Sequence, residues 1–315
     1  MRICSIVPSA TEILFAIGEG DAIVAVSHEC DFPPAALAKP KATTTTIDPE
    51  LMSSVEIDYL VAEAIAGGRS MYHIDIDVLR QARPDLIVTQ DLCGVCAVDG
   101  GEVQRAAAKL DPVPRVISLA PSTVADVVQT IRLLGEEVGD WAPASRLAAQ
   151  LQDRIDAVRG AATGLDRPSV LCLEWLDPPW VAGHWMPEIV EIAGGRDVLG
   201  ITGWPSRRAT WAEIAQTQPQ VVILMPCGLG VERTLAEIDV LASVPEVTAL
   251  PAVRNGQVYA VDGSAYFNRP GPRTVDGLEL LAGILNPSRM PSGLPPSAWR
   301  RVDGLGRRAP ESHGV

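Results

Sequence analysis

The sequence has no hydrophobic run long enough to cross a membrane and no concentration of positive charge. None of its apolar stretches approaches the roughly 18 consecutive residues of a membrane-spanning helix. The chain carries 26 Lys and Arg against 39 Asp and Glu, which gives a formal net charge of -13. Because binding to nucleic acid or anionic lipid needs clustered Lys and Arg, this balance disfavours both as partners.

Recognised catalytic and targeting motifs are also missing. There is no P-loop, no Gly-x-Gly-x-x-Gly and no nucleophile with a base and an acid at a recognised spacing. The six cysteines are too dispersed for a disulfide scaffold. Met1–Pro8 has the pattern of a first strand and not of a secretory signal. We therefore expect a cytoplasmic protein, with a periplasmic or cell-surface location as the alternative if a leader has been removed.

What the sequence does contain is an alternation of apolar runs and helical patterns. Its 315 residues, 47% of them hydrophobic, suit two domains. Strand patterns that alternate with helical ones are typical of α/β architecture with parallel sheets. We predict two Rossmann-like α/β lobes with parallel-rich sheets, over residues 1–122 and 161–287. One long connecting helix over 123–160 joins them, and a flexible tail covers 288–315.

Individual helices are predicted from their periodicity and their ends. Ser9–Ile17 is predicted as a helix with Ser9 as N-cap and Glu12 completing a capping box. Thr234–Leu241 is predicted as one helix, and Ile76–Ala82 as a short one that ends before a proline.

The two lobes share a short sequence pattern. Arg83–Val88 and Gln218–Ile223 each place a proline between a short predicted helix and a buried strand. This repetition indicates weak internal symmetry between the lobes.

The unusual residues of the chain gather in the loops that follow the predicted strands. Ligands of open α/β sheets bind outside the carboxyl ends of the strands, and domain interfaces are favoured sites, so these loops are expected to line one interlobe cleft. Their aromatic rings suit a large, planar, partly apolar ligand. The candidate ligand-binding residues are His28, Glu29, Tyr72, Cys93, Glu174, Trp175, Trp180, His184, Trp185, Tyr266, Phe267 and Arg269.

Metal chemistry and catalysis stay open as alternatives. His28 and His184 carry imidazoles that could approach a metal centre within a ligand. Cys30, Cys93 and Cys96, together with His28, could hold zinc or serve a haem, although paired knuckles are missing. The first alternative is therefore a metal or haem binding protein. The second is an enzyme that modifies such a ligand, in which Glu29 and Glu174 act as acid and base.

Four segments carry a resemblance to a known family: residues 5–12 (Ser-Ile-Val-Pro-Ser-Ala-Thr-Glu), His28–Pro34, Glu174–Pro179 and Arg269–Arg273. They resemble the cobalamin-binding branch of the iron-siderophore and cobalamin substrate-binding proteins, the helical-backbone class that serves ABC transporters. The resemblance covers residues 1–287.

The resemblance implies a monomeric, non-catalytic protein that needs no cofactor. Such a protein captures a corrinoid, such as cobalamin, and delivers it to the membrane subunits of an ABC transporter or handles it inside the cell. In the family, an acidic residue on each lobe contacts arginines of the membrane subunits, and Asp77 and Glu213 match these positions best. Asp77 departs from the family's glutamate, and Thr43–Tyr72 is longer than the usual loop.

Overall fold

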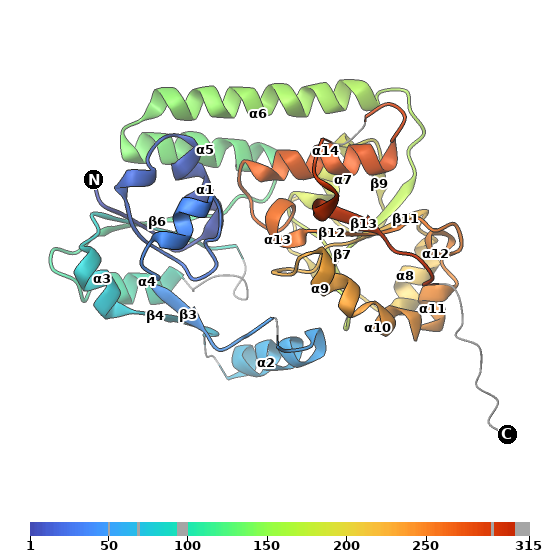
Figure 1. Cartoon of the computed structure of the whole chain (residues 1–315), viewed down its shortest axis with the longest axis horizontal. Helices are drawn as coiled ribbons and strands as arrows, with labels where there is room; N and C mark the ends of the chain where they lie inside the picture. The colour runs from blue at the N-terminus through green and yellow to red at the C-terminus, as the bar shows by residue number, and fades with distance from the viewer. Residues whose placement is uncertain (50, 68–69, 93–99, 291–292, 306–315) are drawn as a thin grey trace. The chain divides into compact units, whose positions relative to one another are not determined.

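The structure, a computed structural model, describes residues 1–49, 51–67, 70–92, 100–290 and 293–305. The chain divides into two compact units, in accord with the predicted two-lobed α/β fold (Figure 1). Unit 1 consists of Met1–Met52, Glu56–Ala157 and Arg269–Asp276, and unit 2 consists of Ser53–Val55, Val158–Asn268 and Gly277–Val315.

Within its described residues, unit 1 contains a four-stranded sheet in the order β2-β1-β5-β6, with every pairing parallel. The central strands β1 and β5 are buried along their whole length, as expected of strands covered on both faces. A separate antiparallel pair joins β3 and β4. The strands are β1 (Ile3–Ser5), β2 (Ile23–Val26), β3 (Thr43–Thr45), β4 (Tyr72–Ile74), β5 (Leu86–Gln90) and β6 (Arg115–Leu119).

Helices cover the sheet of unit 1, with α1 against β1 and β2 and α4 against β5 and β6 (Figure 1). The α-helices are α1 (Pro8–Ala16), α2 (Ser54–Ala66), α3 (Ile76–Ala82), α4 (Gly100–Ala107), α5 (Val124–Val138) and α6 (Trp141–Ala162). Two short 3₁₀ turns are η1 (Gly20–Ala22) and η2 (Pro34–Ala38). Helix α3 has the predicted bounds.

The predicted start of the first helix is wrong. Its N-cap is Val7, no side chain caps it, and Pro8 is its first residue. Proline fits this position because the first backbone N–H of a helix has no intrahelical partner in any case. Ser9 and Glu12 are buried inside the helix, so neither takes part in a capping box.

The long helical connector consists of α5 and α6. Helix α5 begins with a capping box formed by Thr123 and Asp126 and ends at Gly139, which has φ +82°. A Cβ at Gly135 would lie 2.2 Å from the Cβ of Ala144, so the two helices pack closely because residue 135 is glycine. Helix α6 has 22 residues and runs from unit 1 into the part of the chain assigned to unit 2.

Unit 2 has a larger sheet, with the order β10-β8-β7-β11-β12-β13 and β9 also paired with β7. Strands β7, β11 and β12 are parallel to one another, whereas β8, β10 and β13 join in antiparallel pairs. The strands are β7 (Ser169–Trp175), β8 (Trp180–Val181), β9 (Arg196–Asp197), β10 (Arg207–Arg208), β11 (Val221–Leu224), β12 (Val258–Val261) and β13 (Trp299–Arg301).

The helices of unit 2 are mostly short. They are α7 (Met186–Ile192), α8 (Trp211–Thr217), α9 (Val231–Ala236), α10 (Ile238–Ala242), α11 (Pro245–Thr248), α12 (Pro251–Arg254), α13 (Gly263–Tyr266), α14 (Arg273–Leu285, which begins in unit 1) and the 3₁₀ turn η3 (Pro296–Ala298). None of the helices in the described ranges has the length and apolar composition needed to span a membrane.

Two further predictions differ from the structure of unit 2. The single helix predicted over Thr234–Leu241 is wrong, because Glu237 leaves the helical conformation and separates α9 from α10. The segment predicted as a flexible tail contains β13, in which Trp299–Arg301 pair with Val261–Tyr259 of β12. The backbone hydrogen bonds between β13 and β12 hold this part of the segment in place, although the segment is rich in Pro and Ser.

The predicted internal symmetry is visible in the structure. Helices α3 and α8 each end at a residue with φ above +40°, Arg83 and Gln218. A proline follows each of them, and β5 or β11 comes next. Because a residue before proline avoids the right-handed helical region, both helices end at equivalent points.

Candidate functional site

The loop after β2 brings together three residues predicted to bind ligand in unit 1. His28 and Glu29 lie in this loop, and Tyr72 lies at the start of β4. The ring centroids of His28 and Tyr72 are 5.6 Å apart with a tilt of 36°. Tyr72 lies opposite Thr45 in the antiparallel pair of β3 and β4. This pairing places Tyr72 beside His28, although a long segment separates the two residues in the sequence.

His28 is held by Thr43, a residue that the sequence analysis did not single out. The Thr43 Oγ1 accepts the backbone N–H of His28 at 3.1 Å and lies 2.8 Å from His28 Nδ1. Burial, and then the charge of Lys41, lower the pKa of His28 below its usual range, so the imidazole is neutral near pH 7. Among the described residues, the buried His28 Nε2 has no hydrogen-bond partner.

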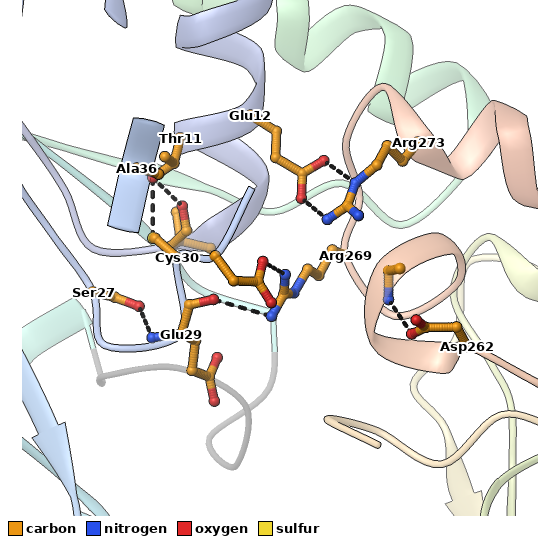
Figure 2. Close-up of polar contacts among 12 residues, drawn as sticks. Thr11, Glu12, Ser27, Glu29, Cys30, Ala36, Asp262, Arg269 and Arg273 are labelled. Carbon is orange, nitrogen blue, oxygen red and sulfur yellow. Dashed lines mark hydrogen bonds and ion pairs between the residues drawn. The ribbon is translucent and has the colours of Figure 1, made fainter. Parts of the chain in front are cut away.

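Arg269 supports this loop from within unit 1 (Figure 2). Its Nη1 donates to Asp31 Oδ1 at 2.5 Å, and its Nη2 donates to the carbonyl oxygen of Glu29 at 3.1 Å. Its side chain is 13% exposed. The guanidinium predicted to bind ligand therefore holds the loop that carries His28 and Glu29.

A second arginine of the same segment pairs with a buried carboxylate. Arg273 donates from Nε to Glu12 Oε2 at 2.9 Å and from Nη2 to Glu12 Oε1 at 2.5 Å. The Cζ of Arg273 also lies 4.2 Å from the centroid of the Phe32 ring. Burial raises the pKa of Glu12 although Arg273 opposes that shift. This bidentate pair, marked in the sequence only by the Arg-Pro-Gly-Pro-Arg motif, fixes the segment to α1.

Cys30 is a buried, neutral thiol in this structure. Its Sγ lies 3.1 Å from Thr11 Oγ1, which donates to Ser5 Oγ at 2.8 Å. Burial raises the pKa of Cys30, and this disfavours the thiolate that zinc requires. No group of three or more metal-ligating side chains occurs in the part of the chain that the structure describes. Cys93 and Cys96 lie outside the described residues, so their predicted roles stay predictions.

In unit 2, two tryptophans form a pair at the end of the central strand β7. Trp175 and Trp180 lie directly opposite each other in the antiparallel pairing of β7 with β8, so their side chains share one face of the sheet. Both side chains are partly exposed. The Trp175 Nε1 donates to the carbonyl oxygen of Ser54, also in unit 2, at 3.2 Å. Glu174 precedes this pair and is half-buried.

His184 lies in a constrained turn of unit 2. Its φ is +51°, in the left-handed region that non-glycine residues rarely adopt. Its backbone N–H donates to the carbonyl oxygen of Trp204 at 2.6 Å, and its carbonyl oxygen accepts from Gly203 N at 2.9 Å. Burial lowers the pKa of His184, so its imidazole is neutral near pH 7. Strain of this kind often accompanies a functional site.

Two of the aromatic side chains predicted to bind ligand, Trp185 and Phe267, are buried. Trp185 is 5% exposed and Phe267 is 0% exposed. The Trp185 Nε1 donates to the carbonyl oxygen of Phe267 at 2.9 Å. Both rings are interior residues of unit 2 in this structure, and the contact with a ligand predicted for them stays a prediction. Tyr266, at the end of α13, is partly exposed and stays a candidate.

The turn before His184 depends on a glycine, which gives a testable prediction. A Cβ at Gly183 would lie 2.4 Å from Trp204 O and 2.6 Å from Ser206 N, both backbone atoms. We expect Gly183→Ala to lower the free energy of unfolding by about 1–3 kcal/mol, measured by urea denaturation. The control Gly160→Ala in α6 meets no atom within 4 Å and should raise stability by about 0.5–1 kcal/mol. Equal midpoints for the two variants would contradict this packing.

The two predicted transporter-docking residues lie in the first turns of α3 and α8. Asp77 is 78% exposed and accepts from Arg80 Nη1 at 2.8 Å. Glu213 is 39% exposed and accepts from Arg207 Nη2 at 2.6 Å, and this hydrogen bond lowers the pKa of Glu213. Asp77 is the second residue of its helix and Glu213 is the third, so the two are near-equivalent and not identical in position.

Comparison with known proteins gives a consistent family match. The sequence profile described as periplasmic binding protein matches residues 3–265. The vitamin B12-binding protein of Vibrio cholerae serotype O1 is 26% identical over 288 residues, which cover 90% of this chain and 88% of that protein. The cobalamin-binding protein of Halobacterium salinarum is 22% identical over 290 residues, which cover 90% of this chain and 69% of that protein.

Solved structures show the same fold. The apo periplasmic heme-binding protein RhuT of Roseiflexus sp. RS-1 has a TM-score of 0.69 at 23% identity and covers 90% of this chain and 97% of its own. The periplasmic vitamin B12 binding protein BtuF of Vibrio cholerae has a TM-score of 0.66 at 22% identity and covers 90% and 96%. These structures confirm the predicted fold, and the profile match confirms the family resemblance. The comparisons give no support to the predicted cytoplasmic location.

Proposed function

Because this chain belongs to the periplasmic binding protein family, we propose that it is a substrate-binding protein whose ligand is a corrinoid of the cobalamin type. Proteins of the family bind a substrate and do not transform it, and they need no cofactor. The proposal therefore treats the corrinoid as cargo, and it sets aside a role as a corrinoid-modifying enzyme.

The observation that carries the proposal is the Trp175–Trp180 pair. Two indole side chains on one face of a sheet, each partly exposed, offer a broad apolar surface. A surface of this kind suits the apolar plane of a large macrocycle. Tyr266 and Tyr72 add partly exposed rings in units 2 and 1.

The relatives narrow the choice of macrocycle. The sequence relatives from Vibrio cholerae and Halobacterium salinarum are named for vitamin B12 and cobalamin, whereas proteins of similar fold include a haem binder. Haem is therefore the alternative that an experiment must separate from a corrinoid. The interlobe position of the ligand stays a prediction from the sequence.

Delivery of the ligand to an ABC transporter completes the proposal. Asp77 and Glu213 would meet the membrane subunits, and their exposed carboxylates are accessible for pairing with arginines. A periplasmic or cell-surface location agrees with such a role better than a cytoplasmic one.

Isothermal titration tests the ligand directly. We expect cyanocobalamin to bind with a Kd of about 1 μM or tighter, which corresponds to about -8 kcal/mol. Haemin, titrated under the same conditions, should bind at least roughly tenfold more weakly, a difference of about 1.4 kcal/mol. Tighter binding of haemin than of cyanocobalamin would make the protein a haem carrier and overturn the corrinoid assignment.

A further inference from the structure

Two neighbouring polar groups of unit 1, His28 Nε2 and the Glu29 carboxylate, have no hydrogen-bond partner in the part of the chain that the structure describes. His28 Nε2 is buried and has no hydrogen-bond partner among the described residues. The nearest carboxylate oxygen, Glu29 Oε1, lies 4.0 Å away, which is too far for a hydrogen bond between them. Both groups therefore have hydrogen-bonding capacity to offer to a ligand. In native proteins an unpartnered buried polar group of this kind calls for an explanation.

The hydrogen bonds of Thr43 assign the tautomer of His28. Thr43 is fully buried, and its Oγ1 already accepts the backbone N–H of His28. Its own hydroxyl hydrogen needs an acceptor, and among the described residues only His28 Nδ1 lies in position, at 2.8 Å. If Nδ1 carried the proton, the buried hydroxyl would lose its acceptor, at a cost of about 1–3 kcal/mol. The network therefore places the proton on Nε2, which makes Nε2–H a free donor.

Arg269 orients the Glu29 carboxylate through the backbone of Glu29. The Glu29 carbonyl oxygen accepts from Arg269, and the Glu29 side chain extends to the other side, away from that guanidinium (Figure 2). Its side chain is 38% exposed. The carboxylate is thus an acceptor beside the Nε2–H donor.

We propose that His28 Nε2–H and the Glu29 carboxylate together bind one peripheral primary amide of the corrinoid. The amide oxygen accepts from Nε2–H, and the amide NH₂ donates to Glu29 Oε1. This inference rests on the proposed function, since a corrinoid carries primary amides around its ring whereas haem carries carboxylates.

The geometry and the charges support this pairing. The oxygen and nitrogen of one amide lie roughly 2.2 Å apart from standard bond lengths, so a donor and an acceptor 4.0 Å apart can each reach one of them. Burial raises the pKa of Glu29 and lowers that of His28, so the site disfavours added charge. A ligand carboxylate in place of the amide would face the Glu29 carboxylate, and like charges at that distance repel.

Nitrogen NMR of the imidazoles tests the tautomer without any ligand. Long-range ¹H–¹⁵N spectra of the whole chain should show His28 with a protonated Nε2 and an unprotonated Nδ1 near pH 7.5. The exposed His73, on strand β4, provides a control imidazole with rapid tautomer exchange. A proton on Nδ1 of His28 would overturn the inference and leave the proposed function intact.

Hydrolysed corrinoids test the amide contact itself. Each isomeric monocarboxylate of cyanocobalamin has one peripheral primary amide converted to a carboxylate, and the intact cyanocobalamin is the reference ligand. We expect the wild-type protein to bind one isomer at least roughly tenfold more weakly than the reference, with the others within about twofold.

Glu29→Gln, which supplies an amide donor to a carboxylate, should bring that isomer within about threefold of the reference. His28→Ala should weaken binding of the reference about five- to tenfold, as expected for loss of one hydrogen bond to a neutral group.

Thermal denaturation of each variant separates loss of folding from loss of the contact, and Glu29→Gln, a nearly isosteric change, is the more informative of the two. Equal binding of all isomers by the wild-type protein, or unchanged discrimination in Glu29→Gln, would overturn the amide contact alone. Failure of cyanocobalamin itself to bind the folded wild-type protein would overturn the proposed function and this inference with it.

Discussion

Replacement of Glu12 by alanine is expected to lower the free energy of unfolding of unit 1 by about 3–5 kcal/mol. The Glu12 side chain is 3% exposed, and its bidentate partner Arg273 is 14% exposed. Removal of the carboxylate takes the bidentate counter-charge from a largely buried guanidinium, and the cost of that change is large. Urea denaturation followed by circular dichroism measures the change.

Two controls separate charge burial from loss of contacts. The double variant Glu12→Leu/Arg273→Met replaces the pair by apolar side chains and should recover most of the lost stability. Arg300→Ala removes the exposed pair with Glu232, whose side chains are 55% and 75% exposed, and should change stability by less than about 1 kcal/mol. A loss in Glu12→Ala as small as that in Arg300→Ala would contradict the role given to the buried pair.

Replacement of both Trp175 and Trp180 by alanine should weaken cyanocobalamin binding roughly 100-fold, or about 2.8 kcal/mol. The reason is that aromatic side chains buried by a ligand account for much of the binding energy at such sites. Titration calorimetry measures the change, and each single variant should lose a part of the affinity.

Trp141→Ala is the matched control for this change. Trp141 is the first residue of α6 and is 49% exposed. Its removal should leave the affinity within about twofold of the wild-type value. Wild-type affinity in the Trp175/Trp180 variant, with an unchanged circular dichroism spectrum, would exclude the pair as the ligand surface.

Much of the fold could be predicted because its central elements are encoded locally. The buried strand β5 appears in the sequence as an apolar run after a proline, and α3 ends at the residue predicted for it. The very short strands and the edge strand β13 could not be predicted in this way. Strands β8, β9 and β10 have only two residues each, and β13 exists through its pairing with β12, so their stability depends on tertiary partners.

The sequence indicated which loops hold the candidate residues, and it did not indicate the contacts that these residues make. The motifs after the strands selected His28, Glu29 and Trp175 as candidates, but sequence alone does not say which aromatic ring is buried. Trp185 follows a predicted strand in the same loop region as Trp180 but is interior, and its Nε1 donates to the carbonyl oxygen of Phe267. Long-range pairs such as Arg273 with Glu12, 261 residues apart, leave no periodic signal in the chain.

Competition between two macrocycles tests the central claim most directly. The folded protein is incubated with an equimolar mixture of cyanocobalamin and haemin, passed through gel filtration, and its visible spectrum is recorded. We predict that the protein fraction carries the absorption bands of the corrinoid without a haem Soret band. A protein fraction with the Soret band alone would contradict corrinoid capture as the function of this chain.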